Sequence, residues 1–457
     1  MGVDPGSLLL HFSRNGDFSD GAGDLLVLDR GEGPYVFDVE GRRYLDGLSS
    51  LFCCQLGNSY GEEFGAAAAG QLARLCFNTN WGTAHPAALE LAEQLAARSP
   101  WGSGRVFFTS GGSESVETAW KLARQYHAAR GEGGRRKAIA RVGAYHGVSL
   151  GALSLTGVPS FKEQFGPPAI ETRHVANTNA YRDERDEAER CRDLLDELEA
   201  AIEEEGPETV ALIVAEPVQN AGGCFVPPPG YWPGLREIAD RHGALLLADE
   251  VITGMGRLGE WFGVSRFGAT PDLITLAKGL TSAYAPMGAV LASERVAEPL
   301  YEPGRGLMHG ITFGGHPLCA AVALLNLEIF ERDGVLENVR ALEPHLRGRM
   351  EELLELPIVG DVRGAGFFWA AELVKEDGDG RFDAEERERL LRGFLPARLR
   401  EAGLIARADD RGDAVVQIAP PLICDREQLD EVVEALAAAL ADAGEFMALG
   451  ATGAATR

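Results

Sequence analysis

The chain has 457 residues, of which 45% are hydrophobic and 25% are charged, so it can bury a large core and is not a disordered polymer. Its 43 basic and 69 acidic residues give a net charge of −26, which argues against nucleic acid or an anionic membrane as the main partner. The absence of a long apolar run, and seven cysteines without C-x-x-C spacing, predict a cytoplasmic protein that binds no metal.

The first 60 residues begin with a polar, glycine-rich stretch. They continue into a hairpin pattern, YVFDVEGRRYLD at 35–46, which turns at Gly41. We expect residues 1–60 to form part of a small domain.

Within residues 61–330, the chain from about residue 85 onward alternates strand-like and helix-like segments, which is typical of a mostly parallel sheet sandwiched by helices. The apolar runs of the strands are nearly continuous, as in strands buried on both faces. An acidic segment at 182–205 carries an apolar stripe and predicts an amphipathic helix. We expect one large α/β domain here, with strands at 105–109, 137–142, 209–215, 244–251, 272–276 and 287–292.

The remaining residues, 331–457, mix helical and strand patterns in an α+β arrangement. Together with residues 1–60 they are expected to complete a small domain built from both termini. The predicted elements are helices at 334–356 and 384–402, a strand at 366–374 and a last helix from Arg426.

The glycine motif GMGRLG, Gly254–Gly259, follows a predicted strand and matches the dinucleotide fingerprint G-x-G-x-x-G. That fingerprint needs a helix to begin within the glycines, so that its N–H groups meet the pyrophosphate. The next residues, EWFGVSRFGATPD, have no helical period. An NAD-dependent dehydrogenase that uses this motif is therefore only an alternative.

A better phosphate site is TSGGSES at 109–115, where a predicted strand ends and a helix begins. Gly112 allows the backbone to approach an anion, and Ser113 adds a hydroxyl at the positive end of the helix dipole. The short loop suits one phosphate monoester. The same residues are equally compatible with a plain serine cap and a glycine turn.

Three further groups follow predicted strands: Tyr145, Asp249 and Lys278. Ligands of open α/β sheets bind at this edge. The alternative for Asp249 and Lys278 is a simple buried salt bridge. Together with the phosphate site, however, these residues would suit a phosphorylated aromatic aldehyde as ligand. Lys278 offers an amine, Asp249 a carboxylate and Tyr145 an aromatic ring. Pyridoxal phosphate is the cofactor that needs this set of groups.

Six ordered motifs between Asp46 and Pro421 strongly resemble class III, pyridoxal-phosphate-dependent aminotransferases of fold type I. They are TSGGSESVETAWKLAR, AYHG, AEPVQNAGG, LLLADEVITGMGRLG, PDLITLAKGL and HGITFGGHPLCAA. The resemblance implies a homodimer whose large domain carries the cofactor, and two such dimers could pair into a tetramer. It also implies that GMGRLG is structural.

The resemblance further implies a role for each matching position. Lys278 would form the Schiff base with the cofactor and shuttle the proton, and Asp249 would pair with the pyridinium. Val251 and Tyr145 would lie against the two faces of the ring. The phosphate would be bound by Gly112 and Ser113, with Thr312 reaching across from the other subunit.

The substrate is indicated by departures from the family pattern. The ornithine and 4-aminobutyrate branch has a second glutamate where this chain has Ala221, which moves the resemblance toward the ω-amino acid:pyruvate and amine:pyruvate branch. Arg407 matches the mobile arginine that binds a substrate carboxylate, with Arg411 as its rival. Phe52 and Trp81 match aromatic positions of the substrate pocket, Trp81 in the partner's site.

We therefore expect an aminotransferase that moves an amino group from an ω-amino acid or amine to a 2-oxo acid, with pyruvate as the expected acceptor, by a ping-pong mechanism. Within the same fold, an aminomutase or a decarboxylating transaminase is the alternative, because the cofactor residues do not choose among these reactions.

Overall fold

A computed structural model describes residues 6–18, 25–375, 380–409 and 411–454, with the backbone alone for 449–454. Its centre is a seven-stranded sheet in which β5, β6, β7, β8 and β9 run parallel, while β10 lies antiparallel to both of its neighbours. In spatial order the strands are β4 (Arg105–Thr109), β10 (Gly288–Ala292), β9 (Leu273–Leu276), β8 (Leu245–Asp249), β7 (Val210–Ala215), β5 (Lys137–Arg141) and β6 (Thr172–Val175).

Six of these strands are predicted from their apolar runs, and each is confirmed to within two residues at either end. The seventh, β6, was not predicted, because its sequence TRHV is short and mostly polar. Every residue of β7 to β10 is buried, as expected for strands covered on both faces.

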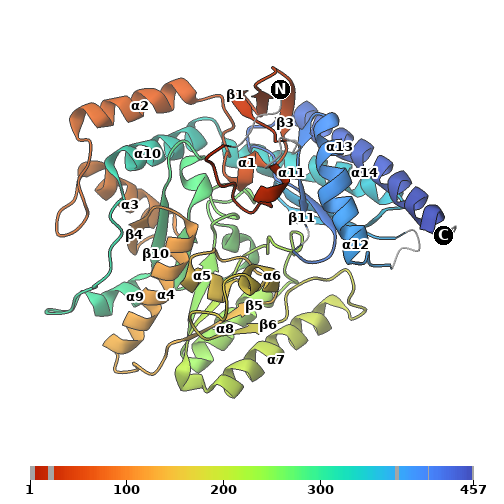
Figure 1. The fold of residues 1–457 in the computed structure, drawn as a ribbon. Helices are drawn as coiled ribbons and strands as arrows, with labels where there is room; N and C mark the ends of the chain where they lie inside the picture. Colours follow the sequence, from red (N-terminus) through yellow and green to blue (C-terminus); the bar gives the residue numbers. More distant parts are fainter. Residues whose placement is uncertain (1–5, 19–24, 376–379, 410, 455–457) are drawn as a thin grey trace.

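Helices cover both faces of this sheet (Figure 1). Alternate strand residues such as Leu212 and Leu247 pack under α4 (Gly112–Ala129) and α5 (Leu150–Leu155). Their neighbours Ile213 and Leu246 point to the other core, which includes α7 (Glu187–Glu205) and α8 (Tyr231–His242). The remaining helices of residues 49–332 are α1 (Ser49–Phe52), α2 (Gly61–Arg74), α3 (Pro86–Arg98), α6 (Pro159–Glu163), α9 (Glu294–Ala297) and α10 (Pro317–Arg332).

Two four-stranded sheets lie outside residues 61–330. One contains the predicted hairpin, which turns at Gly41 with φ +83°, and joins it to a strand from the far end of the chain. Its strands are β1 (Leu28–Glu32), β2 (Tyr35–Asp38), β3 (Arg43–Asp46) and β13 (Leu404–Ile405); the other sheet has β11 (Val359–Ala365), β12 (Phe368–Leu373), β15 (Val415–Ile418) and β14 (Arg407–Asp409).

Helices of the C-terminal part pack beside these sheets, and Figure 1 shows β1 and β3 near α13. They are α11 (Val335–Glu351), α12 (Ala384–Arg387), α13 (Leu395–Glu401) and α14 (Arg426–Ala454). The predicted helix at 384–402 is interrupted by a π-helical turn, Glu388–Phe394. We propose domain boundaries near residues 60 and 330, because all strands of the large sheet fall between them.

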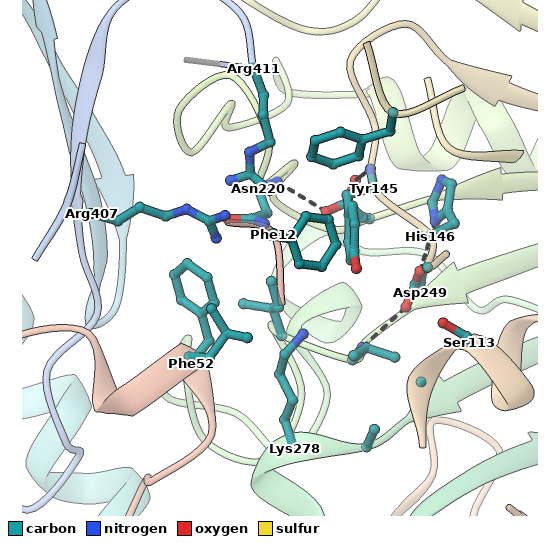
Figure 2. A pocket seen from close by; sticks show the side chains of 18 of the residues that line it. Phe12, Phe52, Ser113, Tyr145, His146, Asn220, Asp249, Lys278, Arg407 and Arg411 are labelled. Atoms are coloured by element: carbon teal, nitrogen blue, oxygen red, sulfur yellow. Dashed lines mark hydrogen bonds and ion pairs between the residues drawn. The ribbon is translucent and has the colours of Figure 1, made fainter. Parts of the chain in front are cut away.

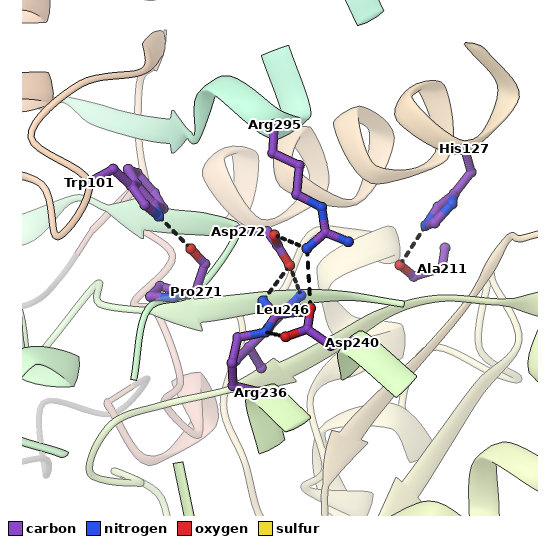
Figure 3. Close-up of polar contacts among 9 residues, drawn as sticks. All are labelled: Trp101, His127, Ala211, Arg236, Asp240, Leu246, Pro271, Asp272 and Arg295. Carbon is purple, nitrogen blue, oxygen red and sulfur yellow. Dashed lines mark hydrogen bonds and ion pairs between the residues drawn. The ribbon is translucent and has the colours of Figure 1, made fainter. Parts of the chain in front are cut away.

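Polar contacts tie together the edge of the large sheet where β8 and β9 begin (Figure 3). Buried Asp272 accepts hydrogen bonds from Arg236 Nη1 at 2.7 Å, Arg295 Nη1 at 3.1 Å and the Leu246 amide at 2.9 Å. The indole of Trp101 donates to the Pro271 carbonyl at 2.7 Å. The opposite edge, where β8 and β9 end, carries the groups described next.

No helix in the described part of the chain is both long and apolar enough to span a bilayer.

Candidate active site

A cavity of about 360 Å³ lies at the carboxyl ends of the parallel strands (Figure 2). It brings together eight residues singled out in the sequence: Phe52, Gly112, Ser113, Tyr145, Asp249, Val251, Lys278 and Arg407. Arg411 lines it as well. Strand order explains this, because parallel strands send their carboxyl ends to one edge of the sheet.

Lys278 comes directly after β9 and points its amine into the cavity (Figure 2). Its backbone has φ +42°, an uncommon conformation for a residue with a side chain. Asn326 of α10 supports the turn by donating to the carbonyls of Gly279 and Leu280 at 3.0 and 3.2 Å. Burial lowers the pKa of Lys278, which favours the neutral, nucleophilic amine.

Asp249 ends β8, and its carboxylate is held on both oxygens. Oδ1 accepts from the Thr275 hydroxyl at 2.9 Å and the Val251 amide at 3.2 Å, while Oδ2 lies 2.7 Å from His146 Nδ1. The structure has no ion pair between Asp249 and Lys278, so the alternative of a simple buried salt bridge between them is wrong. The partner is His146, which the sequence analysis missed although it lies in the AYHG motif beside Tyr145.

Tyr145 is anchored through its backbone, whose amide donates to Glu216 Oε1 at 3.2 Å. Its ring meets the ring of Phe161 edge to face, with centroids 6.2 Å apart. Val251 lies against the start of α4, because a Cβ added at Gly112 would come within 3.1 Å of Val251 Cγ1. Tyr145 and Val251 therefore supply aromatic and aliphatic walls to one cavity.

Gly112 and Ser113 open α4, so this long helix presents its unpaired N–H groups and positive dipole end to the cavity. The Ser113 hydroxyl accepts from the Val148 amide at 3.1 Å. Gly147 has φ +115°, and a Cβ there would come within 2.4 Å of Ser113 Oγ. The backbone at Gly147 is thus packed closely against Ser113.

Phe52, the last residue of α1, is buried and meets Phe368 edge-on at 5.6 Å between centroids. The guanidinium carbon of Arg407 lies 6.0 Å from the centre of the Phe52 ring. Ser49, Ser50 and Phe52 all have positive φ, so a strained segment forms this wall.

Trp81 and Thr312 do not line the cavity of their own chain. Trp81 is 63% exposed, and a Cβ at Gly310 would lie 2.8 Å from its ring, so the segments around residues 81 and 310 adjoin. Asn80 joins them with a hydrogen bond of 3.0 Å to the Gly314 carbonyl.

Gly254–Gly259 form turns, and no α-helix begins there. Buried Arg257 within this segment donates to the carbonyls of Phe367 and Pro420, which lie in the C-terminal part of the chain. These contacts give the motif a structural task, as the family resemblance implied.

The cavity also has lining residues that sequence reasoning missed. Glu216 and Asn220 belong to the EPVQN motif, so the family pattern could have indicated them. Phe12 and Phe161 had no such signal; the two rings lie 5.3 Å apart and bring the N-terminal segment to the cavity rim. Within the described residues, no group of three His, Cys, Asp or Glu side chains could hold a metal ion.

Comparisons with known proteins find similar proteins that match most of the chain. Residues 19–440 match the family model described as aminotransferase class III. A probable aminotransferase of Mycobacterium tuberculosis is 49% identical over 96% of this chain and 93% of its own length. A putrescine–pyruvate aminotransferase of Pseudomonas aeruginosa is 40% identical over 89% of this chain and 88% of its own.

Among solved structures, an (S)-enantioselective ω-transaminase from Thermomicrobium roseum superposes with a TM-score of 0.90. It is 41% identical, and the match covers 95% of this chain and 96% of that one.

Proposed function

Because this chain belongs to the class III aminotransferases, a pyridoxal-phosphate-dependent family, we propose that it transfers an amino group from an amine or ω-amino acid to pyruvate in two ping-pong half-reactions. The observation that carries the proposal is one cavity in which the amine of Lys278, the braced carboxylate of Asp249 and the start of α4 face a common space.

These residues fit the cofactor chemically. Gly112 and Ser113, at the start of α4, would hold its phosphate through N–H groups and a hydroxyl. Tyr145 and Val251 would enclose its ring, and Asp249 would pair with the ring nitrogen. A Cβ at Gly147 would overlap with Ser113, and a Cβ at Gly112 would press against Val251.

When bound, pyridoxal phosphate supplies an aldehyde that bonds to amines and a protonated ring that accepts electrons. His146 and Thr275 keep the Asp249 carboxylate in place, where it would hold the proton on the ring nitrogen of the cofactor. Lys278 Nζ would take the proton from the carbon that bears the donor amine and would return it to the former aldehyde carbon of the cofactor. Buried surroundings lower the pKa of Lys278 and thereby suit it to act as a base.

Arg407 receives the carboxylate of pyruvate, because a guanidinium forms two parallel hydrogen bonds to a carboxylate. Phe52 packs beneath Arg407 and contributes an apolar wall for the donor. The relative named putrescine–pyruvate aminotransferase supports pyruvate as the acceptor.

The enzyme acts as a homodimer in which each subunit gives Trp81 and Thr312 to its partner's cavity. Support comes from exposed apolar side chains around these residues, since large exposed patches mark protein interfaces. The exposed fractions are 63% for Trp81, 98% for Met308 and 60% for Phe313.

The test is absorption spectroscopy of the cofactor-loaded protein. An amino donor should bleach the visible band, pyruvate should restore it, and alanine should accumulate. Lys278→Ala should lose at least ~10³-fold in turnover, which corresponds to ~4 kcal/mol of barrier, and should release the cofactor on dialysis because no covalent link holds it. Lys137→Ala, which removes a lysine paired with Glu205, is the control.

A spectrum that does not respond to any amine, or steady transamination by the Lys278 variant, would contradict the proposed function.

A further inference from the structure

Two guanidinium groups from one segment reach the cavity. Arg407 begins β14, and Arg411 follows two residues after that strand ends. Figure 2 shows both on the side of the cavity opposite Lys278, Arg407 above Phe52 and Arg411 beside Asn220. The family resemblance offers Arg407 and its rival Arg411 for one carboxylate-binding role and gives the two arginines no separate roles.

Arg411 is a buried group, with 5% of its side chain exposed, and it is paired with Asp409, whose side chain is 1% exposed. Nε donates to Asp409 Oδ1 at 2.7 Å, and Nη2 donates to Asp409 Oδ2. Burial by itself would raise the pKa of Asp409, but the charges of Arg411 and Arg407 and the hydrogen bonds from Arg411 lower it. The pair therefore stays ionic.

Arg411 is also held in orientation by the wall of the cavity. Its Nη2 lies 3.4 Å from Gln417 Oε1, and Gln417 Nε2 donates to the Asn220 carbonyl at 2.7 Å. The backbone amide of Asn220 in turn donates to Glu216 Oε2 at 3.0 Å. The hydrogen bonds that Arg411 makes to described residues use Nε and Nη2, which leaves Nη1 as the donor for a ligand in the cavity.

The two arginines lie at different places in the cavity, Arg407 above Phe52 and Arg411 beside Asn220 (Figure 2). Burial and the charge of Arg407 lower the pKa of Lys278, the charge of Arg411 acts on Glu216, and the charges of both act on Tyr145. From these positions, a carboxylate next to the reacting carbon would meet Arg407, whereas a carboxylate farther along the same ligand would meet Arg411.

The carboxylates of the cavity lining are already engaged. Glu216 accepts from the backbone amides of Tyr145 and Asn220, and Asp249 is held by His146 and Thr275. A second ammonium group on a donor would thus face guanidinium groups of like charge, which disfavours it.

We propose that Arg411 is a second carboxylate site, which binds the distal carboxylate of an ω-amino acid donor, while Arg407 binds the carboxylate of the 2-oxo acid acceptor. This proposal rests on the proposed function and narrows its donor to ω-amino acids over diamines. Arg411 is then a residue that determines specificity, and Asp409 and Gln417 position it.

The test compares donors of similar length in single half-reactions, followed by absorbance: 4-aminobutanoate, butylamine and 1,4-diaminobutane. The variant is Asp409→Asn with Arg411→Gln, which removes the pair without leaving a buried charge. In the wild type, kcat/KM should be highest for 4-aminobutanoate and lowest for the diamine. In the variant, the ratio of kcat/KM for 4-aminobutanoate to that for butylamine should fall by ~10- to 100-fold, the range for losing a charge-assisted hydrogen bond.

Two further variants keep the result interpretable. Arg411→Lys retains the charge without the planar fork, so the ratio should fall by less. Arg266→Gln with Glu343→Gln removes another bidentate ion pair, with bonds of 2.8 and 3.0 Å, outside the cavity and controls for a general loss of packing.

An equilibrium measurement separates this proposal from the proposed function. Glutarate has two carboxylates and no amine, so it binds without reacting. Calorimetry should show an affinity about tenfold weaker both in Arg407→Gln and in the Asp409/Arg411 double variant. If Arg407→Gln alone weakens binding and the donor ratio is unchanged, Arg411 is only a structural ion pair and the proposal is wrong. If no amine reacts with the wild type, the proposed function fails, whereas the glutarate result still decides the role of Arg411.

Discussion

At the scale of single residues, Asp249 is positioned by contacts from three parts of the chain. Val251 lies on its own segment, Thr275 on the neighbouring strand β9, and His146 after β5. Burying an ionised carboxylate without such partners would cost several kcal/mol. This arrangement orients the carboxylate toward the cavity before a ligand arrives.

Asp249→Asn tests the role of this charge. The amide can still accept from Thr275, but it cannot hold a proton on a ring nitrogen, so we expect kcat to fall by ~10³-fold or more, or ~4 kcal/mol. The measurement is steady-state transamination together with the content of bound cofactor. A near-normal kcat would mean that Asp249 is a structural group.

At the scale of elements, the segment that follows β8 depends on a second buried acid, Glu250. Its side chain accepts hydrogen bonds from the Thr253 hydroxyl and from the amides of Gly263 and Val264, at 2.5, 2.9 and 2.7 Å. These bonds close the turns that contain the glycine motif and fix where β8 ends. Burial raises the pKa of Glu250 from 4.5 to about 7, and the charge of Asp249 adds to this.

A raised pKa means that the folded state binds the proton more tightly than the unfolded state does. The stabilisation of the folded state by the tighter proton binding of Glu250 is therefore fully present below pH 4.5. It is lost as the pH rises to about 7. Glu250→Gln cannot titrate. Between pH 5 and 7.5, the free energy of unfolding of the wild type should fall relative to this variant by roughly 2 kcal/mol.

Urea unfolding at the two pH values measures this difference, with Glu260→Gln, in the same segment, as the control for losing one carboxylate. A difference between wild type and Glu250→Gln that does not change with pH would show that Glu250 is already ionised at pH 5.

At the scale of the whole molecule, the two residues proposed to serve the partner's cavity lie on an exposed surface of the chain. Trp81 and Thr312 lie on adjoining segments outside their own cavity, near exposed Met308 and Phe313. A two-fold symmetric dimer would bring these segments to the partner's cavity and would bury this apolar surface. The strong net charge does not prevent this, because charges are screened within about 10 Å at ordinary salt.

Phe313→Asp tests this arrangement. Placing a charge in an apolar interface should shift the protein from a dimer, twice 48.9 kDa, to a monomer, and cofactor affinity should fall with it because Thr312 no longer reaches the phosphate. Sedimentation velocity measures the mass. Leu354→Asp, at a residue 48% exposed in the C-terminal part, is the matched control. A wild-type protein that sediments as a monomer would contradict the dimer.

The amino-acid sequence by itself determined six strands of the large sheet and the residues that follow them, because apolar runs mark buried strands and parallel strands end at one edge. It thereby placed Ser113, Tyr145, Asp249 and Lys278 together, and the motifs identified the family. Only the tertiary structure decided that Asp249 pairs with His146, that Arg411 pairs with Asp409 inside the cavity, and that Phe12 reaches its rim. Such contacts depend on how loops and side chains are oriented after folding, which local hydrophobic patterns do not encode.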